Sequence, residues 1–219
     1  MEDNQKKCED TKARLIDAAG EVFARQGYQS ATVRDICSRA GTHVGAVNYH
    51  FRDKDGLYAA VLEYSHQSAK LKYPPDFGLR DNPTPEDKLR SFILSLLLRM
   101  LSDGFPAWHG KLIAQEIANP TPAVDAIVEG FVRPVYDYLT GILNEILYDG
   151  VPVDEDTSDV SFLCSMSVLG QCMQYFMGRR LVNHVCPKSF DPKNIERIAD
   201  HITRLTVGGI RELDLGREL

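Results

Sequence analysis

The sequence predicts an all-α protein in which an N-terminal helix-turn-helix domain precedes a larger helical bundle. Apolar residues recur every three or four positions along most of the chain, and no run alternates with a period of two. Proline, glycine and capping residues divide this pattern into roughly nine stretches of helical length. The 219 residues are enough to bury two separate cores, and we expect one domain at residues 11–60 and another at residues 61–219.

Four helices are predicted before residue 72, after a charged leader at residues 1–10 that we expect to be disordered. Gly27 and Gly41 follow the first two apolar stripes, at the position where glycine commonly ends a helix. Asp53 is a favourable N-cap residue for the fourth helix. The apolar stripes place these helices at residues 11–27, 33–40, 44–50 and 53–71.

Five more helices are predicted beyond a proline-rich segment, residues 71–87, which we interpret as a domain linker. Pro85, Pro122 and Pro192 stand where proline is favoured, in the first turn of a helix. Pro134 lies inside a helix and should kink it, because proline removes a backbone hydrogen bond. The stripes place these five helices at residues 85–100, 108–117, 122–149, 157–183 and 193–213.

The charge of the chain is unevenly distributed. Its formal net charge is −6, but residues 11–54 carry seven Lys and Arg against four Asp and Glu, a local charge of +3. Screening over about 8–10 Å lets such a basic region attract phosphates independently of distant acidic residues. The asymmetry is therefore compatible with nucleic-acid binding by the N-terminal domain.

Membrane and secreted proteins are disfavoured by the sequence. The longest apolar run, residues 92–98, is far shorter than the roughly 20 residues of a membrane span. The charged N-terminus lacks the apolar core of a signal peptide. The five cysteines are scattered and form no CxxC pair, which favours free thiols in a reducing compartment. We therefore expect a cytoplasmic protein with no membrane partner.

Residues 32–62 carry the most informative pattern. Two short helices joined by a turn at Gly41 are typical of a helix-turn-helix, whose second helix enters the major groove of DNA. Val47 and Phe51 are four residues apart and should face the core. The outer face of the same helix then carries Val44, Gly45, Asn48 and Tyr49.

Several side chains in this region suit contacts with DNA. Asn48 can form two hydrogen bonds with adenine, and Gly45 permits close approach of the backbone. Tyr49, His50 and Arg52 suit phosphate contacts.

Lys54 and Thr32 each stand at the start of a helix. A lysine in the first turn opposes the helix dipole, so the position of Lys54 is explained if a phosphate docks beside it. The alternative, in which Lys54 is a solvated surface charge, stays open. Thr32 offers a hydroxyl and an amide to a phosphate in a similar way.

The segment from Gly41 to Phe51, followed by Lys54 and Leu57, is similar to the signature of the TetR family of one-component regulators. That signature is a GxxxGxxYxHF recognition helix followed by xxKxxL, and the resemblance extends over residues 11–62. The resemblance implies a homodimeric repressor that binds double-stranded operator DNA and is released by a small-molecule effector. It implies no enzymatic activity, no cofactor and no metal.

The resemblance also implies roles for individual residues. The implied phosphate-binding residues are Thr32, Tyr49, His50 and Lys54. The implied base-reading residues are Arg34, Val44, Gly45 and Asn48, and Thr42 and His43 complete the predicted DNA-binding set. The family often has Ser or Thr at the positions of His43 and Ala46, and Tyr at that of Asn48. Ala46 cannot make the hydroxyl–phosphate contact, and Asn48 should alter the base preference.

The C-terminal region should form, by the same resemblance, a bundle with an internal ligand pocket and a dimer face made by the last two long helices. The stretch EIANPTP, residues 116–122, resembles the CecR-like subgroup. The predicted pocket residues are Met100, Trp108, His109, Gln115, Glu116, Phe131, Met173, Phe176 and Met177. Any one of them could instead be an ordinary core residue. A small-residue face predicted for the dimer seam consists of Ser161, Cys164, Ser165, Val168 and Cys172.

Two rival interpretations come from other classes of protein. An enzyme could use His184, Cys186 and His201 as metal ligands or Cys164 as a nucleophile. The spacing matches no tetrahedral zinc pattern, however, and no base is placed beside Cys164. A helical adaptor without DNA binding is disfavoured by the local charge of +3. For a regulator, we expect the helix at residues 53–71 to carry the coupling between effector and DNA.

Overall fold

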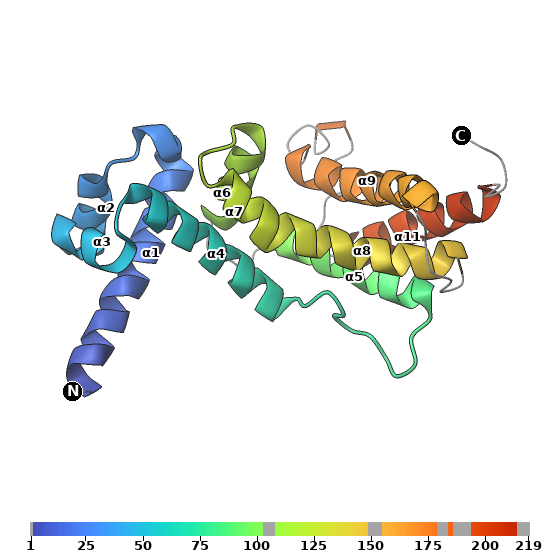
Figure 1. Cartoon of the computed structure of the whole chain (residues 1–219), viewed down its shortest axis with the longest axis horizontal. Coiled ribbons are helices and arrows are strands. Elements are labelled where there is room, and N and C mark those ends of the chain that lie inside the picture. The colour runs from blue at the N-terminus through green and yellow to red at the C-terminus, as the bar shows by residue number, and fades with distance from the viewer. Residues whose placement is uncertain (1, 103–107, 149–154, 179–183, 186–193, 214–219) are drawn as a thin grey trace. The chain divides into compact units, whose positions relative to one another are not determined.

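The computed structural model describes residues 2–102, 108–148, 155–178, 184–185 and 194–213. All regular structure in these ranges is helical, which confirms the predicted fold class (Figure 1). None of the helices described is both long and apolar enough to cross a membrane. The elements are α1 (Glu2–Ser30), α2 (Val33–Ala40), α3 (Val44–Phe51), α4 (Lys54–Lys72), α5 (Pro85–Leu101), α6 (Trp108–Ala118), α7 (Val124–Ile127), the π-helix η1 (Val128–Val132), α8 (Arg133–Tyr148), α9 (Glu155–Met177) and α11 (Ile195–Glu212).

The chain packs as two compact units. The first unit combines Met1–Ala69 with Asp103–Val132, and the second combines Lys70–Ser102 with Arg133–Leu219. These units differ from the expected division at residue 60, because α6 packs against α1 rather than with the later helices. The first unit therefore contains the helix-turn-helix together with α6, α7 and η1.

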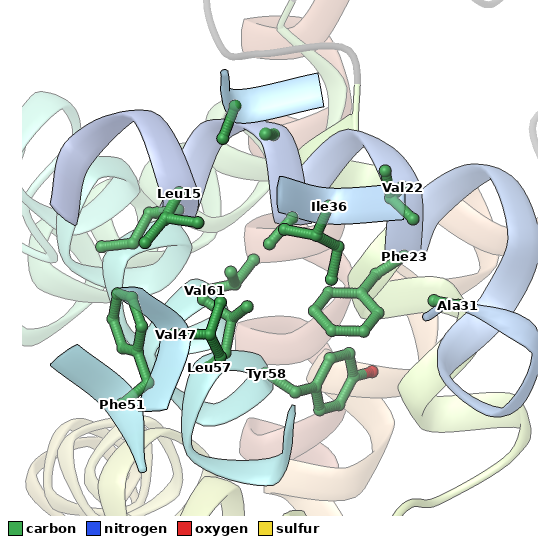
Figure 2. Packing of buried hydrophobic residues seen from close by; sticks show 14 of the residues in the cluster. Leu15, Val22, Phe23, Ala31, Ile36, Val47, Phe51, Leu57, Tyr58 and Val61 are labelled. Carbon is green, nitrogen blue, oxygen red and sulfur yellow. The ribbon is translucent and has the colours of Figure 1, made fainter. Parts of the chain in front are cut away.

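The core of the first unit is built from one apolar face of each of its first four helices (Figure 2). The ring of Phe23 on α1 meets that of Tyr58 on α4 edge-on, with centroids 4.8 Å apart. Trp108 and Leu112 of α6 complete this core. Burial of each large apolar side chain stabilises the fold by about 1.5–3 kcal/mol, so α6 is an integral part of the unit.

Helix α1 departs from its predicted bounds at both ends. Residues 2–10, expected to form a disordered leader, belong to the first turns of α1. Asp10 and Arg14 form an ion pair at the i, i+4 spacing that supports a helix. At Gly27 the backbone leaves helical geometry (φ 79°, ψ 161°), as predicted, but the chain resumes a helical turn that ends at Ser30.

Four helices, α5, α8, α9 and α11, pack side by side in the second unit (Figure 1). Its core consists of their facing apolar residues, such as Leu97, Leu143 and Ile202. Lys88 of α5 and Glu145 of α8 form an ion pair of 2.6 Å at the edge of the bundle. The helical bundle expected for the C-terminal region is thus confirmed for the helices described.

The proline-rich segment between α4 and α5 is fastened to α5 through its backbone carbonyls. Ser95 Oγ and Arg99 Nε both donate to the carbonyl of Tyr73, at 2.8 and 2.7 Å. Ser91 Oγ donates to the carbonyl of Phe77 at 2.9 Å. Burial of the guanidinium lowers the pKa of Arg99 to about 10. The segment predicted as a linker is therefore a packed part of the second unit.

The long helix predicted at residues 122–149 is divided into α7, η1 and α8. The π-helix η1 ends at Val132, two residues before Pro134. A proline leaves a carbonyl of the preceding turn without its α-helical partner, and a π-helical turn is one of the ways in which a helix adapts to such an interruption. The interruption expected at Pro134 therefore takes the form of η1.

The small-residue face of α9 packs inside the second unit. Ser161 and Ser165 are both buried; Ser161 Oγ donates to Asn144, and Ser165 lies 3.0 Å from the hydroxyl of Thr140 on α8. Val168 and Cys172 on the same face are also fully buried. Four of the five residues predicted for the dimer seam are therefore buried within this chain, where small side chains allow a close approach of α8, whereas Cys164 is only partly buried.

Candidate nucleic-acid interface

A tight turn at Gly41 joins α2 to α3. Gly41 adopts the left-handed conformation (φ 63°, ψ 42°), which glycine reaches without steric cost. The backbone N–H of Thr42 donates to the carbonyl of Cys37 at 3.0 Å and closes the end of α2. The geometry is that of a helix-turn-helix, with α3 as its second helix.

Thr32 caps the N-terminus of α2. Its hydroxyl oxygen accepts from the backbone N–H of Asp35 at 3.1 Å and donates to the Asp35 carboxylate at 2.8 Å. The side chain is exposed. Arg34, in the first turn of the same helix, is also exposed. Both residues predicted to reach DNA from α2 therefore lie at the surface.

Helix α3 has one buried and one exposed face, as the sequence predicts. Val47 and Phe51 are buried, and Ala46 joins them in the core. The exposed set comprises His43, Val44, Gly45, Asn48 and Tyr49, with Thr42 and His50 partly exposed. The side chain of Tyr49 is 78% exposed, although large aromatic rings are usually buried. This face offers hydrogen-bonding and apolar groups that a major groove can accept.

Lys54 has partners inside the chain that the sequence did not predict. Its ammonium donates to the backbone carbonyls of Ala31 at 3.0 Å and Gln29 at 3.4 Å. It also lies 4.4 Å from the ring centroid of Tyr28. Carbonyls at the end of a helix attract a cation, so Lys54 fastens the corner between α1 and α2. It is neither simply solvated nor free to reach a phosphate with all three of its protons.

The corner between α3 and α4 is equally constrained. The Asp53 carboxylate accepts from the backbone N–H of Gly56 at 2.8 Å, which confirms Asp53 as the cap of α4. This bond, together with neighbouring Arg52, lowers the pKa of Asp53. A Cβ atom at Gly56 would lie 2.1 Å from the carbonyl oxygen of Phe51. Gly56 is thus required by close backbone packing, and no periodic pattern in the sequence indicates it.

The predicted effector residues are divided between the two units. Trp108, Gln115, Glu116 and Phe131 lie in the first unit; Met100, Met173, Phe176 and Met177 lie in the second. The side chain of His109 lies outside the described part of the structure.

Those in the first unit contact α1 or α4. Trp108 Nε1 donates to Asp17 at 3.3 Å, and Gln115 Nε2 donates to the carbonyl of Ala24 at 3.2 Å. The ring of Phe131 stacks on His66, with centroids 4.3 Å apart. Three of the predicted effector residues therefore have contacts within the first unit.

A surface cavity of about 420 Å³ lies between α9 and α11. The sequence did not predict it, because its lining comes from two helices that are distant in the chain. Its lining residues are Val160, Leu163, Cys164, Ser167, Gln171, Leu205, Thr206, Gly209, Ile210 and Leu213.

Enzyme chemistry gains no support from the residues described. Within the described ranges, no three His, Cys, Asp or Glu side chains lie close enough together to hold a metal ion. Cys186, one of the imagined ligands, lies outside these ranges. Burial raises the pKa of the Cys164 thiol, which disfavours the thiolate that a nucleophile requires.

Two family models match the chain. "Bacterial regulatory proteins, tetR family" matches residues 15–61, which include α2 and α3. "HTH-type transcriptional dual regulator CecR, C-terminal domain" matches residues 85–210, more than half of the chain. The chain belongs to the TetR family of transcriptional regulators, with a CecR-type C-terminal domain. The resemblance of residues 116–122 to the CecR-like subgroup is thereby confirmed.

Individual transcriptional regulators are similar to this chain over different lengths. The regulator SrpR of Pseudomonas putida is 42% identical over 72 residues, but the match spans only 34% of SrpR and 33% of this chain. The dual regulator CecR of Shigella flexneri is 24% identical, over 90% of both chains. The structure of FadR from Bacillus subtilis, in complex with stearoyl-CoA, superposes with a TM-score of 0.66 at 18% identity, covering 90% of this chain and 98% of FadR. These last two matches cover residues of both units, and the FadR structure shows a similar fold.

Proposed function

We propose that this TetR-family protein is a ligand-responsive repressor that binds operator DNA through α3 and leaves it when a small-molecule effector binds. The observation that carries the proposal is the division of α3 into a buried face, with Val47 and Phe51, and an exposed face, with Asn48 and Tyr49. The first face fixes the helix on the core. The second leaves base-reading groups at the surface of a helix-turn-helix.

The predicted DNA contacts fall into two kinds. Val44, Gly45 and Asn48 lie on the exposed face of α3 and would read base edges together with Arg34. Thr32, Tyr49 and His50 would hold phosphates, with Thr42 and His43 at the start of α3 beside them. Lys54 would stabilise this surface without contacting DNA, because its ammonium donates to carbonyls of α1 and of the α1–α2 corner.

A homodimer through α9 and α11 would present two copies of α3 to DNA. Support comes from the outer faces of these helices, on which Phe162, Leu163, Met166 and Leu205 are about half exposed. A patch of this kind on a soluble chain favours association, and a twofold axis would bring the same patch of both copies together. The cavity between α9 and α11 could then accept side chains of the second copy.

Acyl-CoA thioesters are the effector class to test first, because stearoyl-CoA occupies the related FadR structure. Met100, Met173, Phe176 and Met177 remain the predicted apolar contacts in the second unit. A panel of CoA thioesters of different chain length, added to a preformed protein–DNA complex, should include a member that releases the DNA.

DNA binding itself is tested by fluorescence anisotropy with the DNA upstream of the protein's own gene. We expect Tyr49→Ala to weaken DNA binding about tenfold, because the proposed phosphate contact of Tyr49 is lost. The control is Tyr64→Ala, which removes a half-exposed tyrosine from α4. Equal affinities of these two variants, or no binding by the wild-type protein at low salt, would contradict the proposal.

A further inference from the structure

Glu116 on α6 is a buried carboxylate with three hydrogen-bond donors. It is 6% exposed. Its Oε2 accepts from the hydroxyl of Tyr58 at 2.7 Å. Its Oε1 accepts from the backbone N–H of Thr121 at 2.9 Å and from the Thr121 hydroxyl at 3.1 Å. A buried carboxylate is costly unless it is hydrogen-bonded, so these donors make the position of Glu116 specific.

The three donors come from two different parts of the first unit. Tyr58 lies on α4, 58 residues before Glu116, and Thr121 lies in the turn that follows α6. The Thr121 hydroxyl also accepts from the backbone N–H of Ala123 at 3.2 Å. One carboxylate thus closes the turn between α6 and α7 and ties that turn to α4.

Tyr58 is held rigidly at its end of this link. Its ring packs against Phe23 and Tyr28, with both centroid separations 4.8 Å. Burial and the Glu116 carboxylate raise the pKa of Tyr58, so its hydroxyl stays a donor. Tyr58 stands four residues after Lys54, on the same face of α4. This face therefore holds the α1–α2 corner through Lys54 and the α6–α7 turn through Tyr58.

Helix α6 has two further links to α1. Trp108 donates to Asp17, and Gln115 donates to the carbonyl of Ala24. A Cβ atom at Gly20 of α1 would lie 2.5 Å from the Trp108 ring, so the two helices approach as closely as glycine allows. Together with the Glu116 link, these contacts join α6 to both helices that support α2 and α3.

We propose that Glu116 is a positioning residue for operator recognition. The Glu116 carboxylate joins the α6–α7 turn to α4, and α4 packs with the helix-turn-helix. A displacement of that turn therefore shifts α4. This inference rests on the proposed DNA-binding function and assigns a physical task to the segment at residues 116–122. It differs from the predicted role of Glu116 as an effector contact, because all the contacts named here are made within the chain.

Trp108 is the only tryptophan of the chain and lies buried against α1, so its fluorescence reports how α6 is docked. The variants are Glu116→Gln, Tyr58→Phe and Thr121→Val, with Tyr64→Phe on the same helix α4 as the matched control. In Glu116→Gln, no orientation of the amide can accept from both Tyr58 and Thr121 as the two carboxylate oxygens do. We expect red-shifted Trp108 emission, stronger acrylamide quenching and about tenfold weaker operator binding, with unchanged helix content by circular dichroism. Tyr64→Phe should match the wild type.

A double-mutant cycle separates this role from ordinary loss of stability. The double variant with Tyr58→Phe and Glu116→Gln should differ from Glu116→Gln alone by less than about twofold in operator affinity. The reason is that both substitutions act through one carboxylate. If the two effects multiply, or if Trp108 emission stays that of the wild type in all three variants, the proposal is wrong. Thr121→Val and Tyr58→Phe are mild enough to test it should Glu116→Gln fail to fold. The fluorescence needs no DNA, so a wild-type protein that binds no operator would contradict the proposed function separately.

Discussion

Helices α3 and α9 both present one face to the surface of their unit, but with opposite chemistry. Helix α3 buries apolar Val47 and exposes polar Asn48, as amphipathic helices usually do. Helix α9 buries the small residues Ser161, Ser165, Val168 and Cys172 and exposes the larger Leu163. A polar exposed face suits DNA, whereas an apolar exposed face suits another protein chain. A helix can therefore expose large apolar residues when the small residues on its buried face let a neighbouring helix approach closely.

The largest effect is expected from packing at the base of the DNA-binding surface. Gly56→Ala would place a Cβ atom 2.1 Å from the Phe51 carbonyl oxygen, which belongs to the backbone. We expect the free energy of unfolding to fall by about 3 kcal/mol or more, measured by chemical denaturation. The matched change in the bundle is Gly141→Ala in α8, where a Cβ meets no atom within 4 Å. That variant should gain about 0.5–1 kcal/mol, and equal stabilities would remove the proposed contrast in packing.

The apolar face of α9 and α11 is tested next, by a charge. Leu205 on α11 is 57% exposed. Leu205→Glu would place two carboxylates in the proposed dimer interface, one from each copy of the chain. We expect dimer dissociation constants to rise on the order of 100-fold, measured by light scattering after size-exclusion chromatography. Leu71→Glu is the control, because Leu71 on α4 is also highly exposed. A Leu205→Glu variant as dimeric as the control would place the interface elsewhere.

Lys54 and Arg52 distinguish support of the DNA-binding surface from contact with DNA. Arg52 is an almost fully exposed side chain, paired only with neighbouring Asp53 at 3.2 Å among the contacts described. Arg52→Met should reduce the slope of log affinity against log salt by about 0.9, the value for one lost phosphate contact. Lys54→Met should keep that slope and lower the free energy of unfolding by about 1–2 kcal/mol. A reduced slope for Lys54→Met would return this lysine to the phosphate-binding set.

The smallest expected effects compare one helix cap from each unit. Thr32 and Thr84 both cap a helix by accepting from an aspartate N–H at 3.1 Å, Thr32 at α2 and Thr84 at α5. Each Thr→Ala change should cost about 1 kcal/mol of stability. Only Thr32→Ala should also weaken DNA binding, by a few-fold, because its hydroxyl lies at the proposed interface. Equal loss of DNA affinity in both variants would show that the effect comes from stability alone.

Features that depend on neighbours in sequence are predictable. The turn at Gly41, the cap at Asp53 and the two faces of α3 follow from residue types a few positions apart, because capping and helical periodicity are local. The fold class follows for the same reason. Most of the proposed DNA-binding surface can therefore be inferred from the order of the residues in α2 and α3.

Features that depend on distant partners are not predictable in this way. Lys54 binds carbonyls 23 and 25 residues earlier, and Glu116 binds a hydroxyl 58 residues earlier. The sequence predicts Ser161 and Ser165 at an interface between chains. It does not show that Asn144 and Thr140 of the same chain lie opposite them. Residue types alone do not reveal such pairs, since the pairing is decided by how whole helices pack.

The attachment of the segment before α5 has a consequence for engineering. The carbonyl of Tyr73, one residue after the end of α4, is held by both Ser95 and Arg99, whereas Asp81 and Asn82 are exposed. Exposed loop tips accept foreign sequence when no buried hydrogen bond is broken. A peptide tag or a circularly permuted fluorescent protein therefore belongs between Asp81 and Asn82. The same insertion at Tyr73 would remove the carbonyl that accepts hydrogen bonds from Ser95 and Arg99.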